Sequence, residues 1–270
     1  MNIAAASQQD TIKALQAVGQ NRWEVGRELT ARAHDPLAVK LYYWLSYTQN
    51  PGLTDYTGMV QFIRRNPDWP GISALTKDAE SHMPSTMSPH EIIAWFSDYP
   101  PATAAGLDRY LGALIAGGRQ SEAKKILSDW WAQNTMPRED QRHIFRIYGQ
   151  FLTRADHQRR FDALLLRGSN DSALAIADVL GKGYPELAAA RIALRRQNGN
   201  VNALINRVPA SLRKDPGLLY ERLRWRRKND LDAGAVEILR RMPSADKIHN
   251  LEDWWKELHI IIRRLSEKKN

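Results

Sequence analysis

Four arginines in the last third of the sequence are spaced so that they could bind an anion. Arg191 and Arg195 lie four residues apart, and Arg222 and Arg226 repeat that spacing. Residues four apart share one face of an α-helix, so each pair would present two guanidinium groups side by side. Guanidinium groups bind carboxylates and phosphates through paired N–H donors. The sequence therefore offers these four residues as a binding site for an anionic ligand.

The same arginines have a second interpretation, in which they pair with acids of the chain itself. The acids nearest in sequence are Glu186, Asp215 and Glu221. Arg222 and Arg226 fall within the apolar arc that leucines form in a helix predicted over 215–228. A buried charge without a partner is very costly. We therefore expect this helix to be sandwiched between other helices that supply acceptors for its arginines.

The remaining polar residues form no recognisable catalytic or metal-binding pattern. No histidine has a second histidine three or four residues away, and the chain has no cysteine, so no metal site is predicted. The adjacent acids Glu139–Asp140 and Glu252–Asp253 fall in predicted first turns of helices, where carboxylates favour the helix dipole. The glycines around Lys182 lack the phosphate-loop pattern. The sequence predicts no catalytic residue and no cofactor.

Tryptophan is abundant, with nine residues that include the adjacent pairs Trp130–Trp131 and Trp254–Trp255. Indole rings stack on sugars in carbohydrate-binding proteins, and in helical repeat proteins they fill the space between helix pairs. We favour the core interpretation. In each adjacent pair we expect one ring inside the protein and the other at the rim.

The chain carries a net charge of +9, and the whole excess lies in its last third. Residues 180–270 contain 20 of the 39 Lys and Arg residues but only 11 of the 30 Asp and Glu residues. Such a segment suits an anionic polymer or is a solvated helical surface. It lacks the interleaved aromatic and basic residues of a nucleic-acid reader, so no nucleic-acid partner is predicted. No apolar run is long enough for a membrane span.

The periodicity of apolar residues is helical almost throughout, with short breaks at proline and glycine. The predicted helices are 9–20, 22–34, 36–48, 54–66, 71–82, 88–97, 102–117, 119–131, 137–150, 153–167, 169–180, 184–197, 200–207, 215–228, 231–242 and 251–266. Short helices joined by tight turns pack as antiparallel pairs. The predicted fold class is all-α, a right-handed α-superhelix or α-solenoid with degenerate tetratricopeptide-like pairs. Since no long linker interrupts the chain, we expect a single continuous domain over 1–270.

Several stretches, taken together in their order and spacing, resemble a known family. They are Ala33–Ala38 with Leu41–Trp44, Phe62–Pro70, Ile126–Trp131, Asp156–Leu165, Val208–Pro209 with Asp215–Arg227, and Trp254–Trp255. This pattern is similar to the N-terminal superhelical region of the soluble lytic murein transglycosylases. The resemblance covers nearly the whole chain.

The resemblance implies a periplasmic family that cleaves the MurNAc–GlcNAc bond of peptidoglycan and leaves a 1,6-anhydro end. In that family the catalytic glutamate lies in a lysozyme-like C-terminal domain, within a Glu-Ser motif. This chain stops at Asn270, and its pair Glu80-Ser81 lies inside the helical region, so no catalytic role passes to it.

The expected function is therefore a non-catalytic periplasmic scaffold, not an enzyme by itself, whose partner is the peptidoglycan glycan strand. The alternative is a tetratricopeptide-like scaffold that binds a protein partner.

Overall fold

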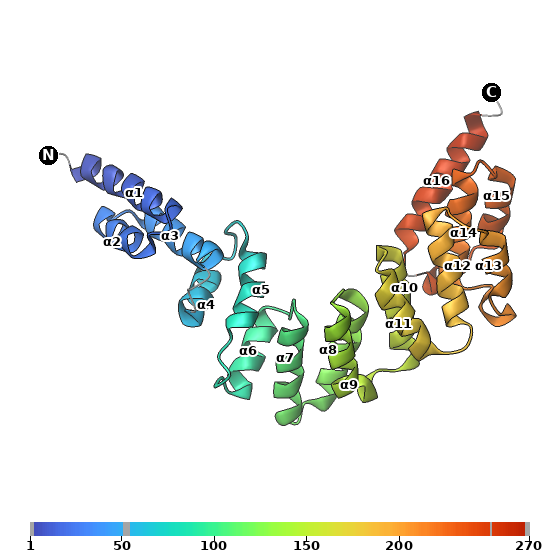
Figure 1. The fold of residues 1–270 in the computed structure, drawn as a ribbon, viewed down its shortest axis with the longest axis horizontal. Helices are drawn as coiled ribbons and strands as arrows, with labels where there is room; N and C mark the ends of the chain where they lie inside the picture. Colours follow the sequence, from blue (N-terminus) through green and yellow to red (C-terminus); the bar gives the residue numbers. More distant parts are fainter. Residues whose placement is uncertain (1–2, 51–54, 249, 268–270) are drawn as a thin grey trace. The chain divides into compact units, whose positions relative to one another are not determined.

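The computed structural model describes residues 3–50, 55–248 and 250–267, and every regular element in these ranges is a helix (Figure 1). The α-helices are α1 (Ile3–Gly19), α2 (Trp23–Ala33), α3 (Pro36–Gln49), α4 (Tyr56–Arg65), α5 (Ile72–His82), α6 (Pro89–Asp98), α7 (Ala104–Ala116), α8 (Gln120–Gln133), α9 (Arg138–Tyr148), α10 (Arg154–Arg167), α11 (Asn170–Leu180), α12 (Tyr184–Arg196), α13 (Val201–Arg207), α14 (Pro216–Lys228), α15 (Asp232–Arg240) and α16 (Leu251–Glu267). Short 3-10 helices follow α9, α13 and α15. The predicted all-α fold class is confirmed.

Each predicted helix is present, and its ends agree with the prediction to within two residues, apart from the start of α1. That helix begins at Ile3 instead of residue 9, because the alanine-rich start of the chain has high helix propensity and no breaker. The capping box at Ser88 is confirmed. The backbone N–H of Ser88 donates to Glu91 Oε2 at 2.8 Å, and the Glu91 N–H donates to Ser88 Oγ at 3.3 Å.

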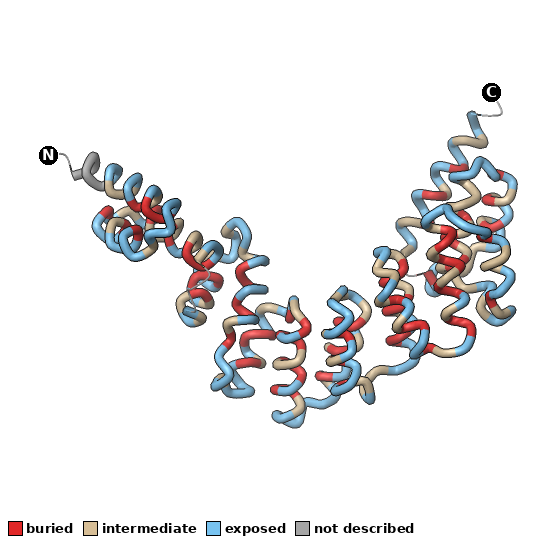
Figure 2. Tube along the Cα trace, in the orientation of Figure 1, coloured by how far each residue is buried: buried red, intermediate tan, exposed pale blue. Residues whose placement is uncertain are grey.

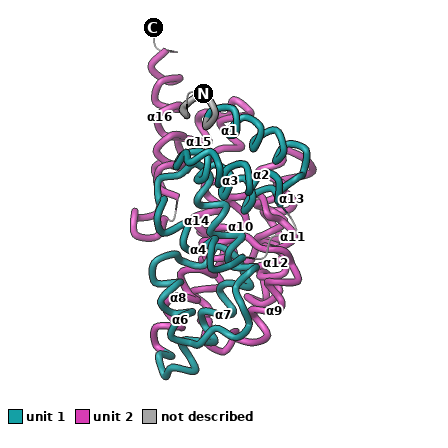
Figure 3. The backbone as a smooth tube through the Cα atoms, turned by 90° about the vertical axis from the view of Figure 1, so that its left-hand side faces the viewer, with its two compact units in different colours: residues 1–120 teal, residues 121–270 magenta. Residues whose placement is uncertain are grey.

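The helices group into two compact units, residues 1–120 and residues 121–270 (Figure 3). In the second unit α12 packs on α11, α13 and α14, and α14 packs in turn on α15 and α16. In the first unit α7 packs on both α5 and α6. Helices thus contact their nearest neighbours and the helix after next, as they do in α-solenoids. The organisation of 1–270 as a single domain stays a prediction.

Buried residues follow the faces along which successive helices meet within each unit (Figure 2). Indole rings contribute much of this interior: Trp95, Trp131 and Trp254 are almost completely buried. The expected split is correct for Trp254 and Trp255, because Trp255 is 64% exposed. It is wrong for Trp130, because both Trp130 and Trp131 are buried.

The sandwiched position expected for α14 is also confirmed. Asp215 caps the helix by accepting the Leu218 N–H at 2.8 Å, and Pro216 occupies the first turn. Leu218 and Leu223 are completely buried, and the helix packs against α12, α15 and α16.

The start of α10 is fixed by a buried carboxylate. Asp156 accepts the Thr153 N–H and the Thr153 hydroxyl, both at 2.7 Å, and it also accepts hydrogen bonds from Ser128 and Arg159. Burial by itself would raise the pKa of Asp156, but the hydrogen bonds from Ser128, Thr153 and Arg159 outweigh it and hold the pKa well below its usual range. Asp156 therefore joins α8 and α10 as an ionised group.

A carboxyl group whose pKa is lower in the folded than in the unfolded protein stabilises the fold above its unfolded pKa, and this contribution is lost as the pH falls. We expect Asp156→Asn to lower the free energy of unfolding by about 2 kcal/mol at pH 7, and by clearly less at pH 3. Urea denaturation of both proteins at the two pH values, followed by tryptophan fluorescence, measures the difference. An equal loss at both pH values would contradict this role of the charge.

Candidate functional site

A pocket of about 390 Å³ lies in the second unit, where side chains from α10, α12, α14 and α16 meet. Its walls are formed by Leu166, Arg195, Tyr220, Glu221, Arg224, Arg227, Asp253, Lys256, Glu257 and Ile260. Seven of these ten residues are acidic or basic. We call this set the α14 pocket, because α14 contributes four of its residues.

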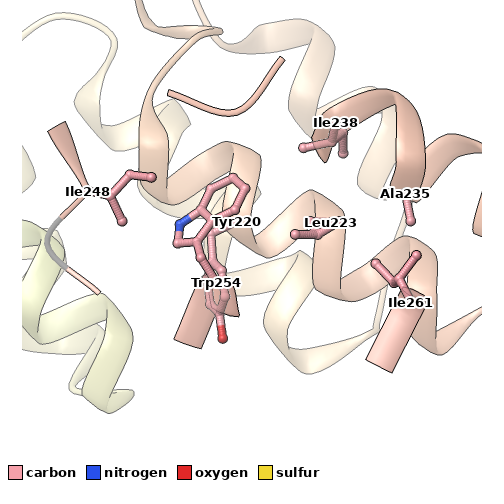
Figure 4. Close-up of a cluster of buried hydrophobic side chains, with 7 residues drawn as sticks. All are labelled: Tyr220, Leu223, Ala235, Ile238, Ile248, Trp254 and Ile261. Carbon is pink, nitrogen blue, oxygen red and sulfur yellow. The ribbon is translucent and has the colours of Figure 1, made fainter. Parts of the chain in front are cut away.

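The α14 pocket adjoins a buried apolar cluster, because Tyr220 belongs to both. Tyr220 lies beside Trp254, with ring centroids 5.8 Å apart, and Leu223 and Ile261 pack in the same cluster (Figure 4). Burial raises the pKa of the Tyr220 hydroxyl to about 12, so the group stays neutral. Since α14 and α16 are both anchored by this cluster, the pocket residues that they carry are held in fixed positions.

Several charges of the pocket already have partners in the protein. Arg227 binds both carboxylate oxygens of Glu257, one of them at 2.8 Å, and this pairing raises the pKa of Arg227. Lys256 lies 3.5 Å from Asp253. Arg195 donates a hydrogen bond to the backbone carbonyl of Leu165. These contacts fix the rim and leave few groups available to a ligand.

The side chains of two further pocket residues, Glu221 and Arg224, form no ion pair or hydrogen bond with the described part of the chain. Glu221 is only 2% exposed, and its Oε2 atom has no donor. Burial raises the pKa of Glu221, and the nearby Arg191, Arg195 and Arg224 lower it in opposition. A buried carboxyl oxygen without a donor is unusual in folded proteins, where such groups are almost always satisfied.

The four arginines predicted from the sequence do not form one surface. Arg195 lines the α14 pocket, but Arg191 is only 1% exposed. The Arg191 side chain donates to Asp162 and lies 3.4 Å from an oxygen of Asp215. Arg191 therefore follows the second interpretation of the sequence, in which the arginines pair with acids of the chain itself. The cause is the position of α12, which packs against both α10 and α14 and buries the face that carries Arg191.

The second predicted pair lies apart from the pocket. Arg226 donates to the Gly234 carbonyl at 2.6 Å and lies 3.4 Å from Glu237, so it joins α14 to α15. Arg222 is half-buried, and burial lowers its pKa, with a further decrease from Arg226. Neither residue lines the α14 pocket. Binding of an anion by any of the four arginines stays a prediction.

Sequence reasoning did not assign the two pocket groups that lack partners. The sequence predicts Glu221 only as a partner for arginines, and it predicts Arg224 only as one of a row of basic residues, four positions before Lys228, that could meet an anion. The sequence does contain one indication, a single acid among five bases within 221–228. Burying an acid is costly unless it is paired or functional, so a lone acid on the buried face of such a helix indicates a pairing or binding role.

The other acidic residues singled out in the sequence lie at the starts of helices or bind backbone groups there. The carboxylate of Glu80 accepts the backbone N–H groups of Ala102 at 2.6 Å and Thr103 at 2.9 Å, together with the Thr103 hydroxyl. Glu139 and Asp140 do lie in the first turn of α9, and Glu252 and Asp253 in that of α16. The residues that the structure covers contain no cluster of three acids or histidines that could hold a metal.

In the described part of the chain, no helix has both the length and the apolar character required to cross a bilayer. No family model matches this sequence, and no curated protein does either.

The structure is similar to a solved structure, the 70 kDa soluble lytic transglycosylase of Escherichia coli, with a TM-score of 0.53 and 14% sequence identity. The match covers 97% of this chain and 54% of the transglycosylase, so the chain spans about half the length of that enzyme. At this level of identity the likeness concerns the fold. The α-superhelical resemblance drawn from the sequence is therefore confirmed at the level of the fold.

Proposed function

We propose that this chain is a non-catalytic superhelical region of a lytic transglycosylase, which positions peptidoglycan strands for cleavage by a domain outside this sequence. The observation that supports the proposal most is the match of 97% of the chain to about half of a lytic transglycosylase. The periplasm is the compartment that this assignment implies, since peptidoglycan is assembled and degraded there.

The distribution of charge is consistent with such a partner. The stem peptides of peptidoglycan carry carboxylates, and the last third of the chain carries the whole positive excess. Nine of the ten residues of the α14 pocket lie in this third, and one of them is Arg224, a cation that forms no ion pair or side-chain hydrogen bond with the described residues. A fold made of many small helix interfaces can present such a site without a large globular core.

Purified sacculi provide the test of this function. The protein is expected to sediment with sacculi at about 0.15 M salt, and retention is expected to weaken as added salt screens the charges. The same mixture is expected to release no soluble 1,6-anhydro-muropeptides, because the catalytic glutamate of the resembled family lies in another domain. Failure to sediment would contradict the binding role, and release of soluble products would contradict the non-catalytic one.

A protein-binding scaffold is the second candidate, and one feature of α16 favours it. Trp255 is 64% exposed and Ile262 is 55% exposed, and the spacing of seven residues places both on one face of the helix. Exposed large apolar side chains on one face are typical of protein-interaction surfaces. Under this alternative, Trp255→Ala together with Ile262→Ala abolishes capture of a protein partner and leaves sedimentation with sacculi unchanged.

A further inference from the structure

The α14 pocket contains an acidic and a basic side chain that form no ion pair or side-chain hydrogen bond with the described residues. Glu221 and Arg224 are three residues apart on α14, yet they form no ion pair with each other. Both line the same cavity, beside the apolar side chains of Leu166 and Ile260. A pocket with an acceptor, a cation and an apolar wall is complementary to a molecule with a donor, an anion and an aliphatic stem.

Because Glu221 is buried, the pocket should discriminate between ligands that carry a hydrogen-bond donor and ligands that do not. An exposed glutamate would be satisfied by water, whereas the Oε2 atom of Glu221 is removed from solvent and has no donor among the described residues. A buried acceptor of this kind favours a ligand that brings a donor and disfavours one that cannot. A purely anionic ligand would place its charge against the Glu221 carboxylate, so Arg224 alone does not define the ligand.

We propose that the α14 pocket binds the part of a peptidoglycan stem peptide that carries both a carboxylate and an ammonium group. The carboxylate would lie on Arg224 and the ammonium group on Glu221. The proposal rests on the proposed function, and it assigns the pocket to the peptide part of the polymer instead of the sugar part. The aliphatic stem of the amino acid lies between Leu166 and Ile260. Arg195 and Lys256 strengthen the positive side of the pocket, although each also has a contact within the protein.

The test uses soluble muropeptides that carry a fluorescent label on the sugar, with binding measured by fluorescence anisotropy. Three modified probes remove one feature each: N-acetylation removes the ammonium group, amidation removes the carboxylates, and enzymatic removal of the peptide leaves the labelled glycan. The unmodified muropeptide is expected to bind, and each modification is expected to weaken binding at least tenfold. Unweakened binding of the peptide-free glycan overturns the peptide assignment but leaves the proposed function standing.

Variants locate the site. Glu221→Gln and Arg224→Gln are each expected to weaken muropeptide binding at least tenfold. Glu186→Gln and Arg240→Gln remove the same charges from exposed positions of the second unit and are expected to leave binding unchanged. Far-UV circular dichroism and a melting curve show whether each variant is folded, and Arg224→Gln changes a half-buried residue at less risk to the fold than Glu221→Gln.

The outcomes are distinct. Binding that is equally strong in wild type, Glu221→Gln and Arg224→Gln overturns the assignment of the pocket, whichever probe is used. If neither muropeptides nor sacculi bind the wild-type protein, the proposed function fails and this inference fails with it.

Discussion

Arg191→Ala is expected to lower the free energy of unfolding of the second unit by about 3–5 kcal/mol. The guanidinium group is 1% exposed and lies between Asp162 of α10 and Asp215, the N-cap of α14. Burial raises the pKa of Asp215, the cation of Arg191 opposes that increase, and Asp162 adds to it. Without the cation, two largely buried carboxylates face each other. The midpoint of urea denaturation, followed by tryptophan fluorescence, measures the loss.

Two further variants separate the charge of Arg191 from its volume. Arg191→Met fills much of the same space without a charge and is expected to be nearly as harmful as alanine. Arg240→Ala removes an exposed arginine of the same unit and is expected to change the midpoint little. If Arg191→Ala unfolds at the same urea concentration as the wild type, the pairing with Asp162 and Asp215 contributes no stability and this account is wrong.

A glycine next to Arg191 provides an independent check on the same contact. Gly217 lies in the first turn of α14, and a Cβ atom placed there would overlap the Arg191 guanidinium group. Gly217→Ala would normally favour the helix slightly. Here it is expected to destabilise the unit instead, because the guanidinium group must move away from its carboxylates.

The helices could be predicted from the sequence because their signals are local. Apolar periodicity places each helix, and residues such as Ser88 and Pro216 mark where a helix begins. The face that each helix buries is a less local property. The segment around Arg191 is rich in alanine and leucine on all sides, and this pattern indicates a helix with neighbours around it. The spacing of Arg191 and Arg195 predicts that both bind a ligand, whereas helix packing buries Arg191 in an ion pair with Asp162.

The α14 pocket could not be predicted for a related reason. Its residues come from four helices spread over residues 166–260, and the sequence does not show which of their charges pair with each other. Arg227 and Glu257 are 30 residues apart and form an ion pair, while Glu221 and Arg224 are three apart and do not. Only the tertiary contacts of α14 and α16 show which groups remain available.

In both units, a buried charged side chain joins a helix to the start of the next helix but one. In the second unit Arg191 of α12 reaches the start of α14 beside Gly217, and in the first unit Glu80 of α5 reaches the start of α7 beside Gly106. In both places a Cβ atom on the glycine would overlap the charged group. A glycine in the first turn therefore makes room for a buried charged side chain at the start of the next helix but one. Glu80 accepts backbone N–H groups there, whereas Arg191 pairs with the carboxylate of the N-cap residue Asp215.

Glu80→Ala is accordingly expected to destabilise the first unit by about 3 kcal/mol or more, because it leaves the Ala102 and Thr103 N–H groups without an acceptor. It also leaves a cavity where the buried carboxylate was. Hydrogen exchange gives a local measurement, since the amides at residues 102–103 should exchange much faster while those of α15 keep their protection. Asp78→Ala, an exposed change on the same helix, is the matched control and should alter neither the melting curve nor these amides.

Glu80→Gln separates the shape of the side chain from its charge. The amide keeps one acceptor oxygen but places an NH₂ group against the N–H donors at the start of α7, and it no longer complements the positive end of the helix. Its cost should therefore fall between those of Asp78→Ala and Glu80→Ala. If Glu80→Gln matches the wild type in both measurements, the carboxylate acts through shape alone and the charge contributes nothing to the junction between α5 and α7.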